Sequence, residues 1–207
     1  MSHTAPPRLE PVVLTGRFVR LEPLEHRHLD DLMAAALTDP AMWAYMPARV
    51  SSRSDLERVI DAALEAQRTG LVLPFAVVDL GAERAIGSTR YLDYRPPDRG
   101  IEIGWTWYAR PAWGTMVNAE SKYLLFRHAF ETLGCLRVQL KTDERNLRSR
   151  AAIARLGAKE EGTLRKHMLV HGTTMRNSVY FSVLDDEWPA VKTGLLERLG
   201  QHGSADT

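Results

Sequence analysis

The chain has 207 residues, of which 44% are hydrophobic and 26% charged, so it can form one globular domain with a sizeable core. Its formal net charge of +1 gives no electrostatic reason to expect a nucleic-acid or membrane partner. The single cysteine, Cys135, excludes an intrachain disulfide framework and a cysteine cluster for zinc, and we expect it to be a buried structural thiol.

We expect neither an N-terminal signal peptide nor a membrane-spanning segment from the sequence. Residues 1–11 contain three prolines and no apolar run, unlike a signal peptide, and no apolar segment of 18 residues occurs in the chain. We therefore expect a cytoplasmic protein with a flexible N-terminus at 1–11, one folded domain at 12–192, and a helix end with a frayed tail at 193–207.

The first half of the chain predicts two helices and then two strands. His28–Leu37 has apolar residues at helical spacing, and the proline after Asp39 ends that helix. Ser54–Glu57 has the spacing of a capping box, which predicts a helix running to about Thr69 and stopping at Gly70. The strands that follow are expected at Leu73–Leu80 and Arg84–Asp93, joined by a turn at Gly81.

The second half predicts strands and helices in alternation, ending in a hairpin that turns at His171-Gly172. The order of elements implies a mixed sheet with helices on both faces. The expected ranges are a strand at Arg99–Tyr108, a helical pattern at Ser121–Phe130, a strand at Arg137–Thr142, a helix at Asn146–Leu156, strands at Gly162–Val170 and Thr174–Leu184, and a helix at Glu187–Leu199.

The most informative segment is Ile101–Glu120, where an apolar strand leads through the loop Ala109–Val117 into a helix. The first N–H groups of a helix have no internal partners, and the helix dipole places its positive end there. Such a strand–loop–helix turn is a natural site for a phosphate or diphosphate group.

Several segments in order make this chain resemble the GCN5-related N-acetyltransferases, and within them the ribosomal-protein N-terminal acetyltransferase-like (RimJ/RimL-like) branch. The segments are Ile101–Glu120, Arg137–Asp143, Asn146–Ser149, Leu156–Ala158, Leu14–Leu24 as the family's first strand, Ala85–Ser88 as its third, and Val179–Trp188 as its closing strand. The resemblance covers roughly residues 12–192. It implies an α/β fold with a mostly antiparallel mixed sheet that splays between its fourth and fifth strands and admits the pantetheine arm of acetyl-CoA.

The resemblance also implies which residues hold acetyl-CoA, the expected co-substrate. Backbone amides of Gly114–Asn118 would face the diphosphate, and the backbone of Trp107 and Tyr108 would pair with the pantetheine like an added strand. The expected cofactor-binding residues are Trp107, Tyr108, Trp113, Gly114, Thr115, Met116, Val117, Asn118, Asn146 and Ser149. No spacing of ligand-type side chains suggests a metal.

The loop departs from the family pattern Arg/Gln-x-x-Gly-x-Gly/Ala, because Trp113, Met116 and Asn118 occupy the three defined positions. Small residues there let phosphates approach the backbone. Met116 either crowds the diphosphate and weakens cofactor binding or turns into the apolar core. We favour the core, because a long apolar side chain gains more from burial than from lying over phosphates.

Acetyl transfer to an amine requires the amine to lose a proton, and Glu102 is the candidate base. Strand alternation predicts that Glu102, Gly104, Thr106 and Tyr108 share one face, with Ile101, Ile103, Trp105 and Trp107 on the other. The alternative for Glu102 is a structural ion pair with a neighbour such as Arg90 or Arg99.

Ser149 is the candidate on the leaving-group side, since a hydroxyl near sulfur could donate a proton to the departing thiolate. Many members of the wider family place a tyrosine seven residues after the Asn of this helix, where this chain has Ile153. The alternative for Ser149 is a first-turn residue that satisfies the helix's own donors.

These features predict an N-acetyltransferase in which acetyl-CoA and a primary amine, either a protein N-terminus or a small molecule, react directly in a ternary complex. A non-catalytic acyl-CoA-binding protein and an acyltransferase for a larger donor such as succinyl-CoA stay open, as does a homodimer. Trp43, Tyr45 and Met46 are read as core rather than acceptor mouth. The basic residues Arg165, Lys166, His167, His171 and Arg176 are read as a solvated hairpin rather than a site for a carboxylate-bearing acceptor.

Overall fold

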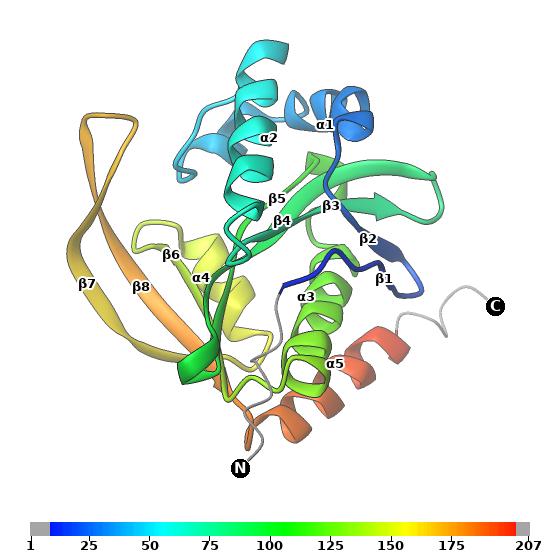
Figure 1. Cartoon of the computed structure of the whole chain (residues 1–207), viewed down its shortest axis with the longest axis vertical. Coiled ribbons are helices and arrows are strands. Elements are labelled where there is room, and N and C mark those ends of the chain that lie inside the picture. The colour runs from blue at the N-terminus through cyan, green and yellow to red at the C-terminus, as the bar shows by residue number, and fades with distance from the viewer. Residues whose placement is uncertain (1–8, 202–207) are drawn as a thin grey trace.

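The computed structural model describes residues 9–201, so most of the expected flexible N-terminus and the frayed tail lie outside the described residues. Leu9, which falls within that N-terminal segment, is buried in the core. Figure 1 shows one mixed sheet surrounded by helices, and eight strands run in the order β1-β2-β3-β4-β5-β6-β8-β7. All neighbouring strands are antiparallel except β5 and β6.

The strands follow the predicted order with one difference at the beginning. The segment expected as a single strand at Leu14–Leu24 is divided by a tight turn, in which the Gly16 amide donates to the Val19 carbonyl at 2.9 Å. The strands are β1 Leu14–Thr15, β2 Val19–Pro23, β3 Leu73–Asp79, β4 Arg84–Arg95, β5 Gly100–Tyr108, β6 Arg137–Asp143, β7 Lys159–Val170 and β8 Thr174–Leu184.

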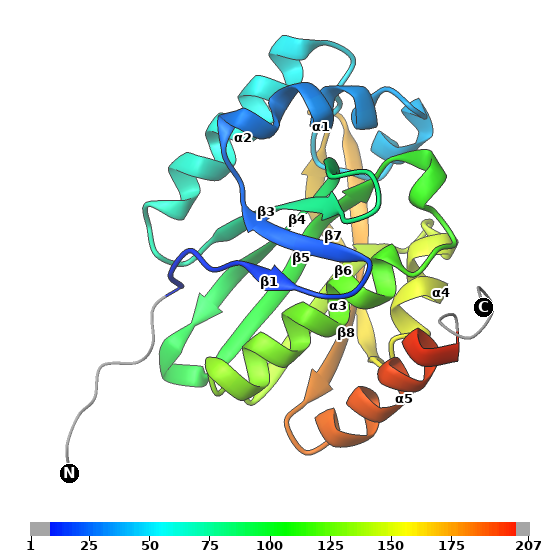
Figure 2. The ribbon, with the colours of Figure 1, turned by 90° about the vertical axis from the view of Figure 1, so that its right-hand side faces the viewer.

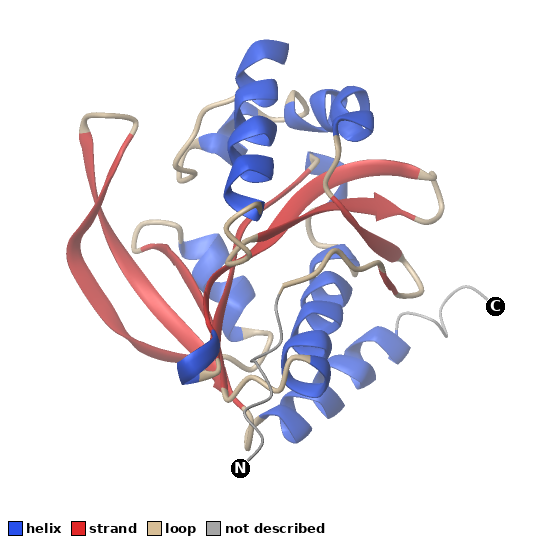
Figure 3. Cartoon of the chain, viewed as in Figure 1, coloured by secondary structure: helices blue, strands red, loops and turns tan. Residues whose placement is uncertain are grey.

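The helices cover both faces of the sheet, as predicted. Figure 2 shows α1 and α2 above the strands and α3 and α5 below them, and Figure 3 separates the helical and strand layers by colour. The helices are α1 Leu29–Ala36, α2 Arg53–Gln67, α3 Val117–Arg127, α4 Leu147–Ala154 and α5 Trp188–Gln201, with short helical turns η1 His26–His28, η2 Pro40–Trp43, η3 Pro96–Asp98, η4 Arg110–Ala112 and η5 His128–Thr132. No helix among residues 9–201 is long and apolar enough to span a bilayer.

The capping box of α2 lies two residues earlier than predicted. Ser52 rather than Ser54 is the N-cap, and its hydroxyl accepts from the amide of Asp55, whose carboxylate accepts from the Ser52 amide in return. An aspartate therefore completes the box where a glutamate was expected. At the other end, Gly70 has a φ of +73°, a conformation that glycine adopts without strain and that stops the helix as predicted.

A buried carboxylate ties the first hairpin to α3. Glu120 is 4% exposed, and its oxygens accept from the backbone amides of Arg17, Phe18 and Val19 at 2.8, 2.6 and 2.8 Å. A Cβ atom at Gly16 would overlap this carboxylate, so only glycine fits beside it. The contact fixes the first turn of α3, which forms one wall of the site described next.

Beyond their first residues β5 and β6 separate, as the predicted fold requires. They pair in parallel only where Gly100–Glu102 faces Arg137–Gln139. Within β5, Trp107 pairs with Ser88 and Gly104 with Arg90, so Trp105 and Thr106 together oppose the single residue Thr89. This β-bulge, in which Trp105 has a φ of +51°, bends the strand away from β6.

Candidate functional site

A cavity of about 340 Å³ lies where β5 and β6 diverge. β5, the loop before α3, β6, α4, the segment after η2 and the β7–β8 hairpin all contribute to its lining. Of the residues singled out in the sequence, those that line it are Glu102, Trp107, Tyr108, Trp113, Gly114, Thr115, Asn118, Asn146 and Ser149. Met116 and Val117 do not line this cavity.

Met116 turns into the apolar interior, which is the alternative that we favoured. Its side chain is 7% exposed and packs with Ala119 of α3 and Leu199 of α5. Val117 is also buried, at 5% exposure. Neither side chain lines the cavity, so the departure from the family pattern places no bulky side chain of Met116 or Val117 in it.

The bulge overturns the predicted alternation along β5. Thr106 hydrogen-bonds Lys122 of α3, so it lies on the face that α3 covers. Trp107 instead packs against Trp43 of η2, with ring centroids 5.0 Å apart, on the opposite face. The prediction that Glu102, Thr106 and Tyr108 share one face is therefore wrong. The inserted residue reverses the alternation after Gly104.

Glu102 lies at the bottom of the cavity with two polar partners from β6. It is 1% exposed, and its carboxylate accepts from Gln139 Nε2 at 3.0 Å and from Lys141 Nζ at 3.1 Å. The parallel register explains the contact, because Glu102 is paired with Gln139 and Lys141 lies two residues further on the same face. The alternative interpretation of Glu102 predicted a structural ion pair with Arg90 or Arg99. Glu102 does form an ion pair, but its partner is Lys141.

Asn146 and Ser149, the two predicted site residues at the start of α4, have different roles. Asn146 is the N-cap, and its Oδ1 accepts from the Ser149 amide at 3.1 Å. The Ser149 hydroxyl has no hydrogen-bond partner among residues 9–201 and lines the cavity. Because the cap is supplied by Asn146, the Ser149 side chain is free to contact a bound molecule.

The loop before α3 has the features of an anion site. Gly114 has a φ of +80°, the N-cap residue Met116 has no side-chain acceptor for the helix amides, and the Val117 amide donates to Thr115 Oγ1 at 3.3 Å. Arg148 of α4 stacks on Trp113, with its guanidinium carbon 3.4 Å from the ring centroid. Burial and the nearby Arg110 lower the pKa of Arg148, whose charge has no carboxylate partner within the described residues. Backbone amides at a helix N-terminus and the unpaired Arg148 suit phosphate groups.

A buried lysine lies behind the bulge. Lys122 of α3 is 4% exposed, lines the cavity, and donates to Thr106 Oγ1 at 2.5 Å and Thr89 Oγ1 at 3.3 Å. It has no carboxylate partner among the described residues, and burial lowers the pKa of Lys122 to about 7. An amine near neutrality therefore lies beside the strand edge that the sequence assigns to the pantetheine.

The opposite end of the cavity is apolar with one buried cation. Tyr45 and Met46 line it, and Met46 also packs against the core, whereas Trp43 belongs to the core, so the reading as core is right for Trp43 and partly right for Met46. Arg176 also lines the cavity and is 5% exposed, which contradicts the solvated reading of the basic hairpin for this residue. The hairpin tip reaches the segment after η2, since Arg176 Nη1 lies 3.5 Å from the Tyr45 carbonyl.

Sequence reasoning missed several residues of the site. Lys141 could have been found, because strand alternation places it on one face with Arg137 and Gln139, opposite the apolar Val138 and Leu140. Arg148 and Arg155 also line the cavity, and their spacing of seven residues places them on one helix face. Arg198 of α5 also lines the cavity, and no local pattern in the sequence could have predicted that position.

Two further expectations concern cysteine and metals. Cys135 is a free, buried cysteine, as predicted, and burial raises the pKa of its thiol to about 11. An inert structural thiol fits both observations. Among residues 9–201 no group of three or more His, Cys, Asp or Glu side chains is arranged to hold a metal ion.

Comparisons with known proteins agree with this geometry. The family model described as "Acetyltransferase (GNAT) domain" matches residues 19–159. The crystal structure of a GCN5-related N-acetyltransferase from Brucella melitensis is 31% identical, with a TM-score of 0.86 over 92% of this chain and 86% of that one. Mycobacterium smegmatis RimJ in complex with CoA-disulfide superposes with a TM-score of 0.76 over 94% and 95% of the two chains, and its 20% identity supports the fold alone.

A curated relative extends the comparison. "Putative ribosomal N-acetyltransferase YdaF" from Bacillus subtilis (strain 168) is 35% identical over 95 residues, which are 46% of this chain. The match spans about half of that relative, 51% of its length.

Proposed function

This chain belongs to the GNAT acetyltransferase family, whose members transfer an acyl group from acyl-CoA, and from this premise we propose that it is an acetyl-CoA-dependent N-acetyltransferase. The acceptor is a primary amine that attacks the thioester directly in a ternary complex. The observation that carries the proposal is the cavity between the diverging strands β5 and β6, whose lining includes the loop before α3, with the features of an anion site, and the buried carboxylate of Glu102.

The donor would enter with its diphosphate at the loop before α3. The amides of Gly114–Asn118, together with Arg148, Arg155 and Arg198, supply positive potential there. The pantetheine would pair with the edge of β5 after Glu102, where β6 no longer forms hydrogen bonds. One lone pair of the Tyr108 carbonyl already accepts from Trp113 Nε1 at 2.9 Å, which holds Trp113 against this edge.

Glu102 would act as the base for the acceptor. A primary amine is mostly protonated at neutral pH, and its nitrogen attacks only after the proton has left. The Glu102 carboxylate lies in the cavity and can take that proton directly or through a water molecule. Lys141 pairs with the carboxylate at 3.1 Å and must share it with the incoming amine.

Collapse of the tetrahedral intermediate breaks the carbon–sulfur bond and leaves a thiolate, which needs a proton. The Ser149 hydroxyl lines the cavity and has no competing partner among residues 9–201, so it is the group that we assign to the sulfur. The hydroxyl would stabilise the thiolate by donating a hydrogen bond, and the thiolate takes its proton from solvent or from the nitrogen of the tetrahedral intermediate, since Ile153 occupies the position where many relatives have a tyrosine. A backbone N–H near Trp107 or Tyr108 would polarise the thioester carbonyl.

The name of YdaF points to a ribosomal acceptor for that protein. For this chain a protein N-terminus and a small-molecule amine are both compatible with a cavity that is lined in part by the segment after η2 and by the β7–β8 hairpin.

A CoA-release assay with acetyl-CoA and succinyl-CoA, run across a panel of N-terminal peptides and small amines, tests the proposal. We expect turnover with acetyl-CoA and at least one amine. Binding of acetyl-CoA without turnover on any amine would favour a binding protein, and turnover only with succinyl-CoA would replace the donor.

A further inference from the structure

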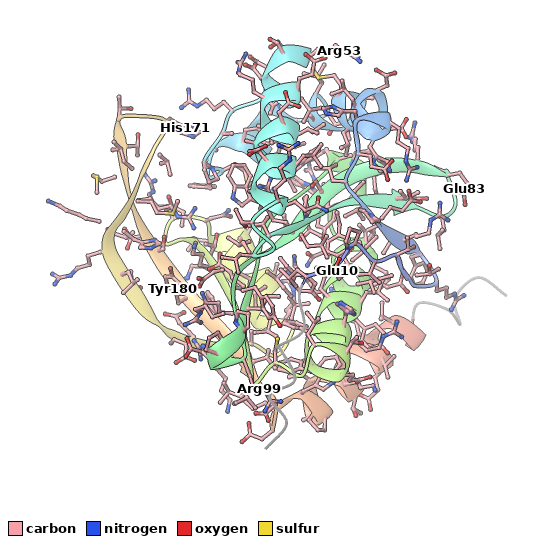
Figure 4. The ribbon with its side chains drawn as sticks, viewed as in Figure 1. Glu10, Arg53, Glu83, Arg99, His171 and Tyr180 are labelled. Carbon is pink, nitrogen blue, oxygen red and sulfur yellow. The ribbon has the colours of Figure 1, made fainter. Side chains whose placement is uncertain are left out.

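Arg176 is a charged residue of the cavity that the proposed reaction does not use. It lies near the start of β8, on the hairpin that Figure 4 shows with His171 at its tip and Tyr180 further along the strand. Its side chain lines the same cavity as Glu102 although it is only 5% exposed. A guanidinium so deeply buried normally has a carboxylate partner.

The protein does not supply that partner. Arg176 Nε donates to Ser178 Oγ at 3.0 Å and Nη1 to the Tyr45 carbonyl at 3.5 Å, both of them neutral acceptors. No carboxylate within residues 9–201 forms an ion pair with Arg176, and Nη2 donates to no described residue. The two nearby carboxylates are engaged elsewhere: Asp143 with Arg145 at 2.7 Å and Glu102 with Lys141 at 3.1 Å.

The guanidinium is also held in place. Ser178, which accepts from Nε, is itself 3.0 Å from His167 Nδ1, and Tyr45 approaches from a segment 131 residues away in the chain. Burial is the main cause that lowers the pKa of Arg176, and the negative charges of Asp143 and Glu102 oppose it. The guanidinium is held through Nε and Nη1, and Nη2 is left for a ligand. It is therefore preorganised to bind an anion.

The surrounding cavity wall limits the size and polarity of what could bind. Leu92 is the strand partner of Glu102, Met168 is the strand partner of Arg176, and both line the cavity. Apolar side chains therefore flank both charged groups, and Met46 adds another to the lining. A ligand that fits would have a cationic or amine end toward Glu102, an anionic end toward Arg176, and an aliphatic portion between or beside them.

We propose that the acceptor amine carries a carboxylate group that pairs with Arg176 while its nitrogen lies toward Glu102, so that the acceptor class is amino acids rather than ordinary peptide N-termini. This inference rests on the proposed function and chooses between its two acceptor classes. In a peptide the α-carboxylate of the first residue is an amide, which cannot form the charge-assisted pair. Loss of such a pair should lower kcat/KM for the acceptor by about tenfold to a hundredfold.

Matched acceptors test the inference in the unaltered protein. The kcat/KM for leucine is compared with that for leucinamide and for 3-methylbutylamine, and the kcat/KM for 4-aminobutyrate with that for propylamine, each with saturating acetyl-CoA. We expect at least one acid to exceed its carboxylate-free counterparts about tenfold or more. Equal or better turnover of the neutral counterparts in both series, or of N-terminal peptides over both acids, would overturn the inference and leave the acetyltransferase assignment intact. Absence of turnover with every amine would overturn both.

Variants then test whether Arg176 is the source of the preference. R176M should raise KM for the preferred acid about tenfold to a hundredfold and leave kcat/KM for its carboxylate-free counterpart nearly unchanged, while R176K should retain part of the preference. R165M is the matched control, because Arg165 is an exposed residue of the same hairpin outside the cavity lining. An equal loss on acid and neutral amine in folded R176M and R176K would contradict the assignment. If R176M fails to fold, the test compares R176K with the unaltered protein by the ratio of kcat/KM for the acid to kcat/KM for its carboxylate-free counterpart. A ratio that is equal in the two proteins would contradict the assignment.

Discussion

The buried carboxylate of Glu120 offers a test of how the site is supported. It accepts three backbone amides from the β1–β2 hairpin and has no cationic partner among residues 9–201. In Glu120→Gln one oxygen becomes an NH₂ group that cannot accept, so at least the Arg17 amide faces a donor. A lost hydrogen bond to a charged acceptor costs about 1.5–3 kcal/mol and an unsatisfied buried donor about 1–3 kcal/mol. The smaller desolvation cost of the neutral amide offsets part of this sum.

We therefore expect Glu120→Gln to lower the free energy of unfolding by about 2–4 kcal/mol, measured from urea unfolding curves with an unchanged m-value. For a domain of this size the melting temperature should fall by about 4–16 °C. Glu10→Gln is the control: it removes the same charge from an exposed residue, labelled in Figure 4, and should change the unfolding free energy by less than about 0.5 kcal/mol. A loss below about 1 kcal/mol in Glu120→Gln would refute the reasoning.

Gly16→Ala provides an independent check on the same contact. Because its Cβ would overlap the Glu120 carboxylate, the substitution should destabilise the parent protein but have much less effect in a Glu120→Ala background, where the carboxylate is absent. Additive losses in the double variant would show that the two residues do not act through this contact.

The remaining predictions concern residues of the cavity. Glu102→Gln should reduce kcat/KM most at the acidic end of the range from about pH 6 to 9, where the amine most needs a base, with the Kd for acetyl-CoA nearly unchanged; equal activity throughout would remove its role. Ser149→Ala should lower kcat about tenfold without loss of stability, since Asn146 supplies the cap. Full activity of this variant would show that the Ser149 hydroxyl does not assist departure of the thiolate. Lys122, whose pKa is lowered to about 7, releases its proton on folding between about pH 7 and 10, so stability relative to Lys122→Met should rise with pH by up to about 1.4 kcal/mol per unit in urea unfolding. A flat difference would contradict a buried neutral amine. Met116→Gly should cost about 2–5 kcal/mol of stability and not tighten CoA binding in calorimetry, whereas tighter binding would mean that Met116 crowds the diphosphate.

The order of strands and helices could be predicted from the sequence because it depends on local pattern. Apolar spacing identifies α1, and the conformational freedom of Gly70 marks the stop after α2. The sequence offers two capping boxes, because Ser52 and Ser54 each have an acidic residue three positions later. Only packing decides that Ser52 is the N-cap.

Features that depend on long-range contacts could not be predicted in this way. The bulge at Trp105 changes which face each later side chain occupies, and a single extra residue leaves no mark in the alternation of hydrophobicity. The partner of Glu102 follows from the parallel register of β5 and β6, which sequence spacing does not set. Arg176 was assigned to a solvated hairpin because its cover comes from Tyr45, which is distant in the chain.

The central claim is that the cavity between β5 and β6 is the acetyl-CoA site. Titration calorimetry of the unaltered protein with acetyl-CoA tests it most directly, with the melting temperature recorded over the same ligand concentrations. We predict one molecule bound per chain and a rise in melting temperature that grows with ligand concentration, because binding to the folded state alone stabilises it. No heat of binding and an unchanged melting curve at millimolar acetyl-CoA would contradict the claim.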